Sequence, residues 1–145
     1  MIVVQAANNS PIVSAIKQGL KHVIPFTNFH TVAEAITTGN PMGGDEIIAK
    51  ASEHGWLAED AAEAEILEAQ RVFAQAGWFV EPATATTLCA VRKLRVAGRI
   101  TAGESVVLML TGAGLKDLDV LKHQPCNIIE SSLDKIRHDL AQALA

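Results

Sequence analysis

The sequence predicts an α/β fold, a three-layer sandwich in which helices cover both faces of a mainly parallel sheet. Two observations carry this prediction: unbroken aliphatic runs such as "MIVVQ" and "SVVLML", and segments of helical periodicity between them. Strands that are buried on both faces form continuous aliphatic runs, whereas strands with one wet face alternate. The order strand, helix, strand, helix, strand is typical of parallel strands joined by crossover helices.

The first half of the chain begins with an expected strand at residues 1–5, a helix at about 11–21 and a looped middle section. The clearest helix signal then begins near Asp60, which is placed to cap the helix, with Glu63 three residues later. Its apolar residues recur at the spacing of one helix face, and a glycine is placed to end it in the left-handed conformation: Ala62, Ile66, Ala69, Phe73, Ala76 and Gly77.

The second half contains two more expected strands, at residues 78–80 and 105–110. Between them we expect a helix that ends at Gly98. The inward face of that helix is predicted to consist of Leu88, Val91 and Leu94.

The C-terminal tail has the pattern of an amphipathic helix. Leu133, Ile136, Leu140 and Leu144 share one face, and the charges on the other face are mixed in sign. Mixed charge without an aromatic anchor favours docking on the core over lying on a membrane surface. We therefore divide the chain into residues 1–123 and a tail helix of the same domain at 124–145.

Composition excludes several classes of protein. A chain of 145 residues that is 49% hydrophobic and 19% charged suits one compact domain. The net charge is −4 and the basic residues are scattered, which predicts no nucleic-acid partner. Without an apolar run of about 20 residues or a signal-peptide pattern, we expect a cytoplasmic protein with no membrane partner. Cys89 and Cys126 form no C-x-x-C pair, so both are expected to be reduced thiols.

The turn "TGAG", residues 111–114, follows the last expected strand. Gly112 and Gly114 suggest a dinucleotide-binding loop, but Leu115, Lys116 and Asp117 follow where that fingerprint needs a further glycine and a helix. A plain tight turn is therefore favoured. Lys116 also lacks the flanking residues of a phosphate-binding P-loop.

Two polar side chains, Glu81 and Thr111, each follow an apolar run at the carboxyl end of an expected strand. Open α/β sheets bind their ligands at this edge, which suggests a crevice lined by both residues. Glu81 is equally well explained as an acid in the first turn of the next helix. The five histidines have no metal-ligand spacing, so no metal site is predicted.

Three segments resemble the C-terminal part of the threonine synthases in order and spacing: "HTVAEAITTGNP", "AEILEAQRVFAQAGWFVEPATATTLCAVRKLRVAGRI" and "ESVVLMLTGAGLKD". The resemblance covers about residues 1–117. It implies part of the large domain of a fold-type II pyridoxal-phosphate enzyme, which converts O-phosphohomoserine and water to threonine and phosphate.

The resemblance also implies the cofactor-binding residues. Thr111 is expected to hydrogen-bond the pyridine nitrogen of pyridoxal phosphate, and Gly112 to let the backbone turn close to the ring. Ala35 and Ile36 are expected along one face of the ring, with Glu81 lining the cleft. The chain departs from the family pattern at Thr37, Thr38 and Ala113, which alters the polar contacts expected at the site.

The Schiff-base lysine and the glycine-rich phosphate loop of the family have no counterpart in this chain, so we assign no catalytic residue. The resemblance implies a fragment that is inactive alone and acts with a complementing N-terminal half, or that forms a homodimer through its exposed strand edge. Two alternatives remain open from the residues: a non-catalytic α/β binding or interaction module, and a nucleotide-binding α/β domain.

Overall fold

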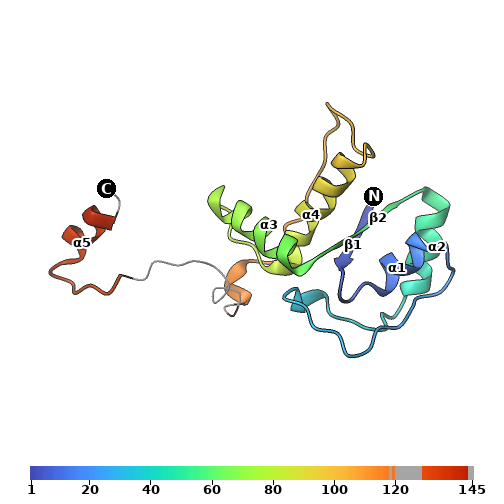
Figure 1. Cartoon of the computed structure of the whole chain (residues 1–145), viewed down its shortest axis with the longest axis horizontal. Coiled ribbons are helices and arrows are strands. Elements are labelled where there is room, and N and C mark those ends of the chain that lie inside the picture. The colour runs from blue at the N-terminus through green and yellow to red at the C-terminus, as the bar shows by residue number, and fades with distance from the viewer. Residues whose placement is uncertain (118, 120–128, 144–145) are drawn as a thin grey trace.

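The computed structural model describes residues 1–117, 119 and 129–143. Its sheet has two parallel strands, β1 (Ile2–Ala6) and β2 (Leu57–Ala61), in a register that pairs Ile2 with Leu57. The helices are α1 (Pro11–Lys17), α2 (Gly44–His54), α3 (Glu63–Gln75), α4 (Pro82–Val96) and α5 (Ile136–Ala143), with the short 3-10 turns η1 (Glu34–Ile36) and η2 (Gly114–Lys116) (Figure 1).

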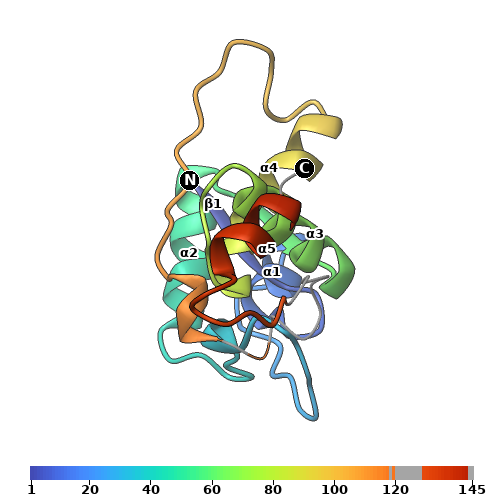
Figure 2. The ribbon, with the colours of Figure 1, turned by 90° about the vertical axis from the view of Figure 1, so that its left-hand side faces the viewer.

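Helices cover both faces of this small sheet, which confirms the α/β class with a parallel sheet. On one face, α1 and α2 pack around Ile12, Ala15 and Ile48, and Val3 of β1 contacts this cluster. On the other face, α4 contacts both strands and carries α3 on its outer side (Figure 2). Alternation along β1 explains the division, because successive side chains of a strand point to opposite faces.

The core between α3, α4 and the carboxyl ends of the strands is built mainly from small side chains. Ala6, Ala61 and Ala85 lie there with the fully buried Ile66 and with Cys89. Burial raises the pKa of the Cys89 thiol to about 11, so it stays protonated near neutral pH. Cys126, the other predicted thiol, lies outside the described residues.

Three elements in the first half differ from the sequence prediction. Helix α1, expected at about 11–21, ends at Lys17. The looped middle section contains α2, whose Ile47, Ile48 and Ala51 face α1 and the sheet. The helix expected from Asp60 begins instead at Glu63, because Asp60 belongs to β2. The N-terminus of α3 is closed by Glu65, which accepts a hydrogen bond from the Ala62 amide at 2.8 Å.

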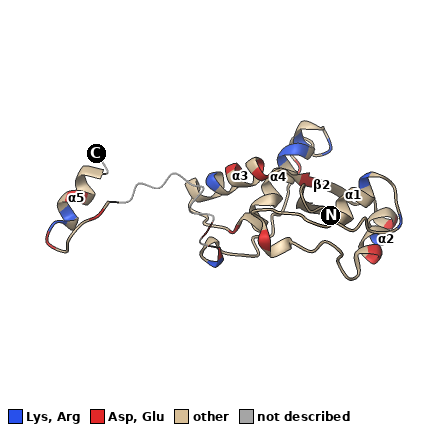
Figure 3. Ribbon diagram, turned by 60° about the horizontal axis from the view of Figure 1, so that its bottom comes forward, with Lys and Arg blue, Asp and Glu red and all other residues tan. Residues whose placement is uncertain are grey.

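The acidic residues of β2, Glu59 and Asp60, form ion pairs with lysines of neighbouring helices. These pairs stabilise a strand that contains few aliphatic residues. Lys17 of α1 lies 3.0 Å from Glu59 Oε2 and 2.9 Å from Asp60 Oδ2. Lys93 of α4 donates to the Asp60 carbonyl at 2.8 Å and lies 2.8 Å from Glu65 Oε2. Figure 3 shows the basic residues in the last turn of α4, where they also complement the helix dipole.

The expected strands at residues 78–80 and 105–110 are not strands in this structure. Val80 forms a single antiparallel bridge to Ala113. Residues 105–110 form neither helix nor strand and run as an open segment (Figure 1). The physical reason is a missing neighbour: within the described residues, β1 pairs only with β2. Val107 is consequently 83% exposed and Met109 68% exposed.

The glycines expected to end the long helices do so, since Gly77 and Gly98 both have positive φ values. The tail forms α5, in which none of the described residues is buried. Docking of this helix on a core therefore stays a prediction, and Leu144 lies outside the described residues. No helix in residues 1–117 or 129–143 is long and apolar enough to cross a membrane.

Candidate functional site

The "TGAG" turn lies against the segment that leads into α4. The amide of Glu81 donates to the Gly112 carbonyl at 3.1 Å, and the amide of Gly114 donates to the Phe79 carbonyl at 2.9 Å. The bridge between Val80 and Ala113 lies between these two bonds. The turn and the start of α4 thus form one backbone unit, at the carboxyl end of the sheet.

Thr84, in the first turn of α4, is buried and hydrogen-bonds to the "TGAG" turn. Its Oγ1 accepts a hydrogen bond from the Gly112 amide at 3.0 Å and lies 3.2 Å from Thr111 Oγ1. Thr84 is 1% exposed, whereas Thr111 is exposed. Sequence reasoning missed Thr84. The available signal was its place two residues after Pro82, in a helix that begins at the carboxyl edge of the sheet.

The carboxylate of Glu81 fills the space beside Gly112. Glu81 is buried, and a Cβ atom added at Gly112 would lie 1.8 Å from Glu81 Oε1. A side chain at position 112 would therefore displace the Glu81 carboxylate from this place. The ammonium of Lys116 lies 3.5 Å from Glu81 Oε2, so the buried carboxylate has a cationic partner.

Glu81 also lines a cavity of about 290 Å³, at the lower end of the roughly 300–1,000 Å³ typical of small-molecule sites. The other residues around it are Glu34, Ala35, Pro82, Ala83, Lys116 and Asp117. The structure therefore brings Ala35 and Glu81 to one cavity. Ile36 instead packs against the core cluster. Thr111 and Gly112 are not among the lining residues, but Gly112 accepts a hydrogen bond from the amide of Glu81, which lines the cavity.

The three departures from the family pattern add no charge to this site. The Thr37 hydroxyl donates to the Glu34 carbonyl and closes η1, and Ala113 forms the bridge to Val80. In the part of the chain that the structure describes, no three His, Cys, Asp or Glu side chains gather in a group that could hold a metal ion.

The turn does not continue into the long helix that a dinucleotide-binding loop requires. After Gly112 and Ala113 the chain forms only the short 3-10 turn η2. A helix that short offers no extended N-terminal dipole to a pyrophosphate group. The geometry therefore disfavours the nucleotide-binding alternative.

Comparison with known proteins gives consistent matches. A threonine synthase of Methanocaldococcus jannaschii is 39% identical over 117 residues, which cover 80% of this chain and 29% of the relative. One from Methanosarcina acetivorans is 38% identical and covers 92% of this chain and 34% of the relative. One from Synechocystis is 34% identical, with 97% and 34% covered. The chain thus spans about a third of the length of the curated relatives it matches.

Solved structures agree on the fold. A fungal L-serine ammonia-lyase from Rhizomucor miehei matches 85% of this chain and 40% of its own, at 18% identity and a TM-score of 0.65. A threonine deaminase from T.th. matches 77% of this chain and 39% of its own, at 21% identity and a TM-score of 0.60. Residues 1–112 match the family described as pyridoxal-phosphate dependent enzyme, and the chain therefore belongs to that family.

Proposed function

We propose that this chain is the C-terminal part of a cytoplasmic, threonine synthase-like enzyme, which converts O-phosphohomoserine and water to threonine and phosphate once the rest of the enzyme is supplied. The observation that carries the proposal is the unit formed by Thr111, Gly112 and Glu81 against Thr84, next to a cavity lined by Ala35. The similarity to threonine synthases over most of the chain supports the choice of reaction.

The residues at this site fit pyridoxal phosphate. Gly112 leaves no side chain at the turn, Ala35 is small enough for a flat ring, and the exposed Thr111 hydroxyl is available to a ring nitrogen. When bound, the cofactor withdraws electrons from the reacting carbon of the substrate. A hydroxyl partner moderates this withdrawal, because unlike a carboxylate it does not favour a charged, protonated ring nitrogen.

The roles of the chain's own residues follow from their contacts. Thr84 fixes the Thr111 hydroxyl at 3.2 Å and thereby orients it. Glu81, buried and paired with Lys116 at 3.5 Å, presents a carboxylate to the cavity that can accept hydrogen bonds from a bound amine or hydroxyl.

The chain alone is expected to be inactive. Covalent catalysis of this kind needs an activated lysine amine, and the lysine that lines the site, Lys116, is engaged with Glu81. Incubation with pyridoxal phosphate and borohydride should label no single lysine, and O-phosphohomoserine should release no phosphate. Specific labelling of Lys116 together with turnover would show that this chain carries its own Schiff-base lysine.

Thr111 is tested in an enzyme completed by an N-terminal half from a threonine synthase. Thr111→Val should lower kcat by about tenfold or more, because the near-isosteric change deletes only the hydroxyl. Thr111→Ser, which keeps a hydroxyl, should retain kcat within a few fold. Equal kinetics for the valine and serine variants would assign Thr111 to the turn alone and contradict its role at the cofactor.

A further inference from the structure

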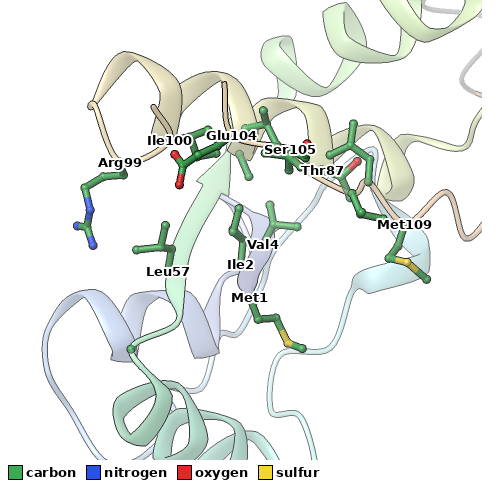
Figure 4. A pocket seen from close by; sticks show the side chains of 16 residues that line it. Met1, Ile2, Val4, Leu57, Thr87, Arg99, Ile100, Glu104, Ser105 and Met109 are labelled. Carbon is green, nitrogen blue, oxygen red and sulfur yellow. The ribbon is translucent and has the colours of Figure 1, made fainter. Parts of the chain in front are cut away.

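A second cavity, of about 640 Å³, lies away from the Glu81 site. Figure 4 shows it as a groove, with Ile2 and Val4 of β1 on one side and Ser105 and Met109 of the open segment on another. The floor of the groove is α4, which contributes Thr87, Ala90 and Val91. We refer to this space between β1, α4 and residues 104–109 as the groove.

One wall of the groove is an unpaired strand edge. The Leu57 amide donates to the Met1 carbonyl at 3.1 Å, and the Ala7 amide donates to the Ala61 carbonyl at 2.8 Å. The odd-numbered residues of β1 therefore direct their backbone groups to β2, since direction alternates along a strand. The backbone groups of Ile2 and Val4 consequently point to the other edge, which pairs with no strand among the described residues.

The other wall is equally unpaired. Within residues 1–117, the backbone of residues 105–110 forms no hydrogen bond to any other residue. Residues 106–110 are nonetheless all apolar, as in a buried strand, and their trace runs on without a helical turn (Figure 1). Extended apolar backbone without partners is normally satisfied by a neighbouring strand.

The two walls run in the same direction. Arg99 and Glu104 line the groove together with Leu57, at the amino end of the strands. Gly112 bonds to Glu81, next to Val80, which packs with Ala6 and Ala61 at the carboxyl ends. Residues 104–110 therefore run parallel to β1, as α/β topology requires after the crossover helix α4.

The size and chemistry of the groove fit one short strand. Strand spacing, rise and layer thickness give roughly 160 Å³ for each residue of a buried strand, so about 640 Å³ holds about four residues. The central walls carry no charge. Arg99 and Glu104 lie at the amino end, and Val4, Ala90 and Leu108 are among the apolar residues that follow.

We propose that the groove accepts one parallel, uncharged β-strand from the polypeptide that completes the enzyme, inserted between β1 and residues 105–110. This inference rests on the proposed function and names the surface by which the missing half attaches. The length of the relatives indicates that the occupant is the remaining part of such an enzyme. About two thirds of each threonine synthase lies outside the region that matches this chain, and the matched part of the solved ammonia-lyase is 40% of its chain. Among the described residues, the two strands β1 and β2 already pair with each other, so neither is free to fill the groove.

The test uses the full chain co-expressed with the part of the Methanocaldococcus jannaschii threonine synthase that precedes the region similar to it. Amide hydrogen exchange at Ile2, Val4 and residues 105–110 should slow by about a hundredfold or more in the complex. The exposed outer surface of α2 serves as the unchanged reference. Cofactor binding and phosphate release are measured on the same sample.

A pair of variants at Val4 tests the edge directly. Val4→Pro removes a backbone donor that β2 does not use and also fixes φ, which the edge of a sheet tolerates. Val4→Ala shortens the side chain and keeps that donor. Both should retain the far-ultraviolet circular dichroism of the parent chain. Val4→Pro should bind the partner half at least tenfold more weakly than Val4→Ala.

The outcomes separate this inference from the proposed function. Complex formation with cofactor binding but unprotected 105–110 amides would overturn the groove assignment and leave the function standing. Protection without cofactor binding would support the groove and contradict the function. Absence of a complex would overturn the proposal. Protection of the 105–110 amides that rises with the concentration of this chain alone would also overturn it, because the occupant would then be a second copy of the chain.

Discussion

Replacing Gly112 by alanine is expected to destabilise the chain by about 1–3 kcal/mol, the usual cost of inserting a methyl group into filled space. The added Cβ would lie 1.8 Å from Glu81 Oε1, so the carboxylate must leave its buried place. In an enzyme completed by a partner half, the same change should lower turnover at least tenfold, because Glu81 would be displaced from the cavity. Urea unfolding and steady-state kinetics measure the two effects.

A double-mutant cycle isolates the cause. In a Glu81→Ala background the space beside Gly112 is empty, so adding Gly112→Ala should cost little further stability. The expected coupling is about 1–2 kcal/mol, within the range for residues in direct contact. Independent, additive effects of the two changes would show that the glycine is needed for another reason.

Ile66→Ala is expected to lower the free energy of unfolding by about 2–5 kcal/mol. Ile66 is fully buried in the cluster that joins α3 to α4 and to the ends of both strands, and the side chains around it are mostly alanines that cannot expand to fill a cavity. Thermal or urea unfolding provides the measurement. The same cluster positions Val80, so the variant should also loosen the "TGAG" turn.

Val96→Ala is the matched control. Val96 is on α4 but 90% exposed, so its replacement should change stability by no more than about 0.5 kcal/mol. A comparable loss of stability in the two variants would show that the α3–α4 cluster is not the core of this chain.

Sequence periodicity identified α1, α3, α4 and β1, because their apolar residues meet partners within the chain, but it missed α2 in the section expected to be looped. It failed at residues 105–110, where the same aliphatic pattern has no neighbouring strand to pair with. It also failed at β2, whose Glu59 and Asp60 are accommodated by Lys17 and Lys93 from distant helices. A local apolar pattern indicates that a segment is suited to burial, whereas strand pairing also requires a neighbouring strand from elsewhere in the polypeptide.

At the candidate site, position at a strand end and the family resemblance singled out Glu81, Gly112 and Ala35. The structure places Glu81 and Ala35 at one cavity, and the roles of all three residues stay predictions. Position and resemblance did not identify Thr84, since a threonine in the first turn of a helix is common and its partners are about thirty residues away in sequence. Ile36 packs against the core cluster and does not line the cavity, so its expected place at the cofactor stays a prediction. Which members of a short segment face a site is decided by tertiary packing.

The pairing of Ile2 with Leu57 has a consequence for the order in which the chain acquires its structure. These partners are more than fifty residues apart, so their strands meet only after a long loop closes, and such closures slow folding. Helices α3 and α4 are separated by only a few residues and have the most extensive contacts between any two elements. We therefore expect the hairpin of α3 and α4 to form early in folding. The strands β1 and β2 are then expected to pair later, against the surface of α4.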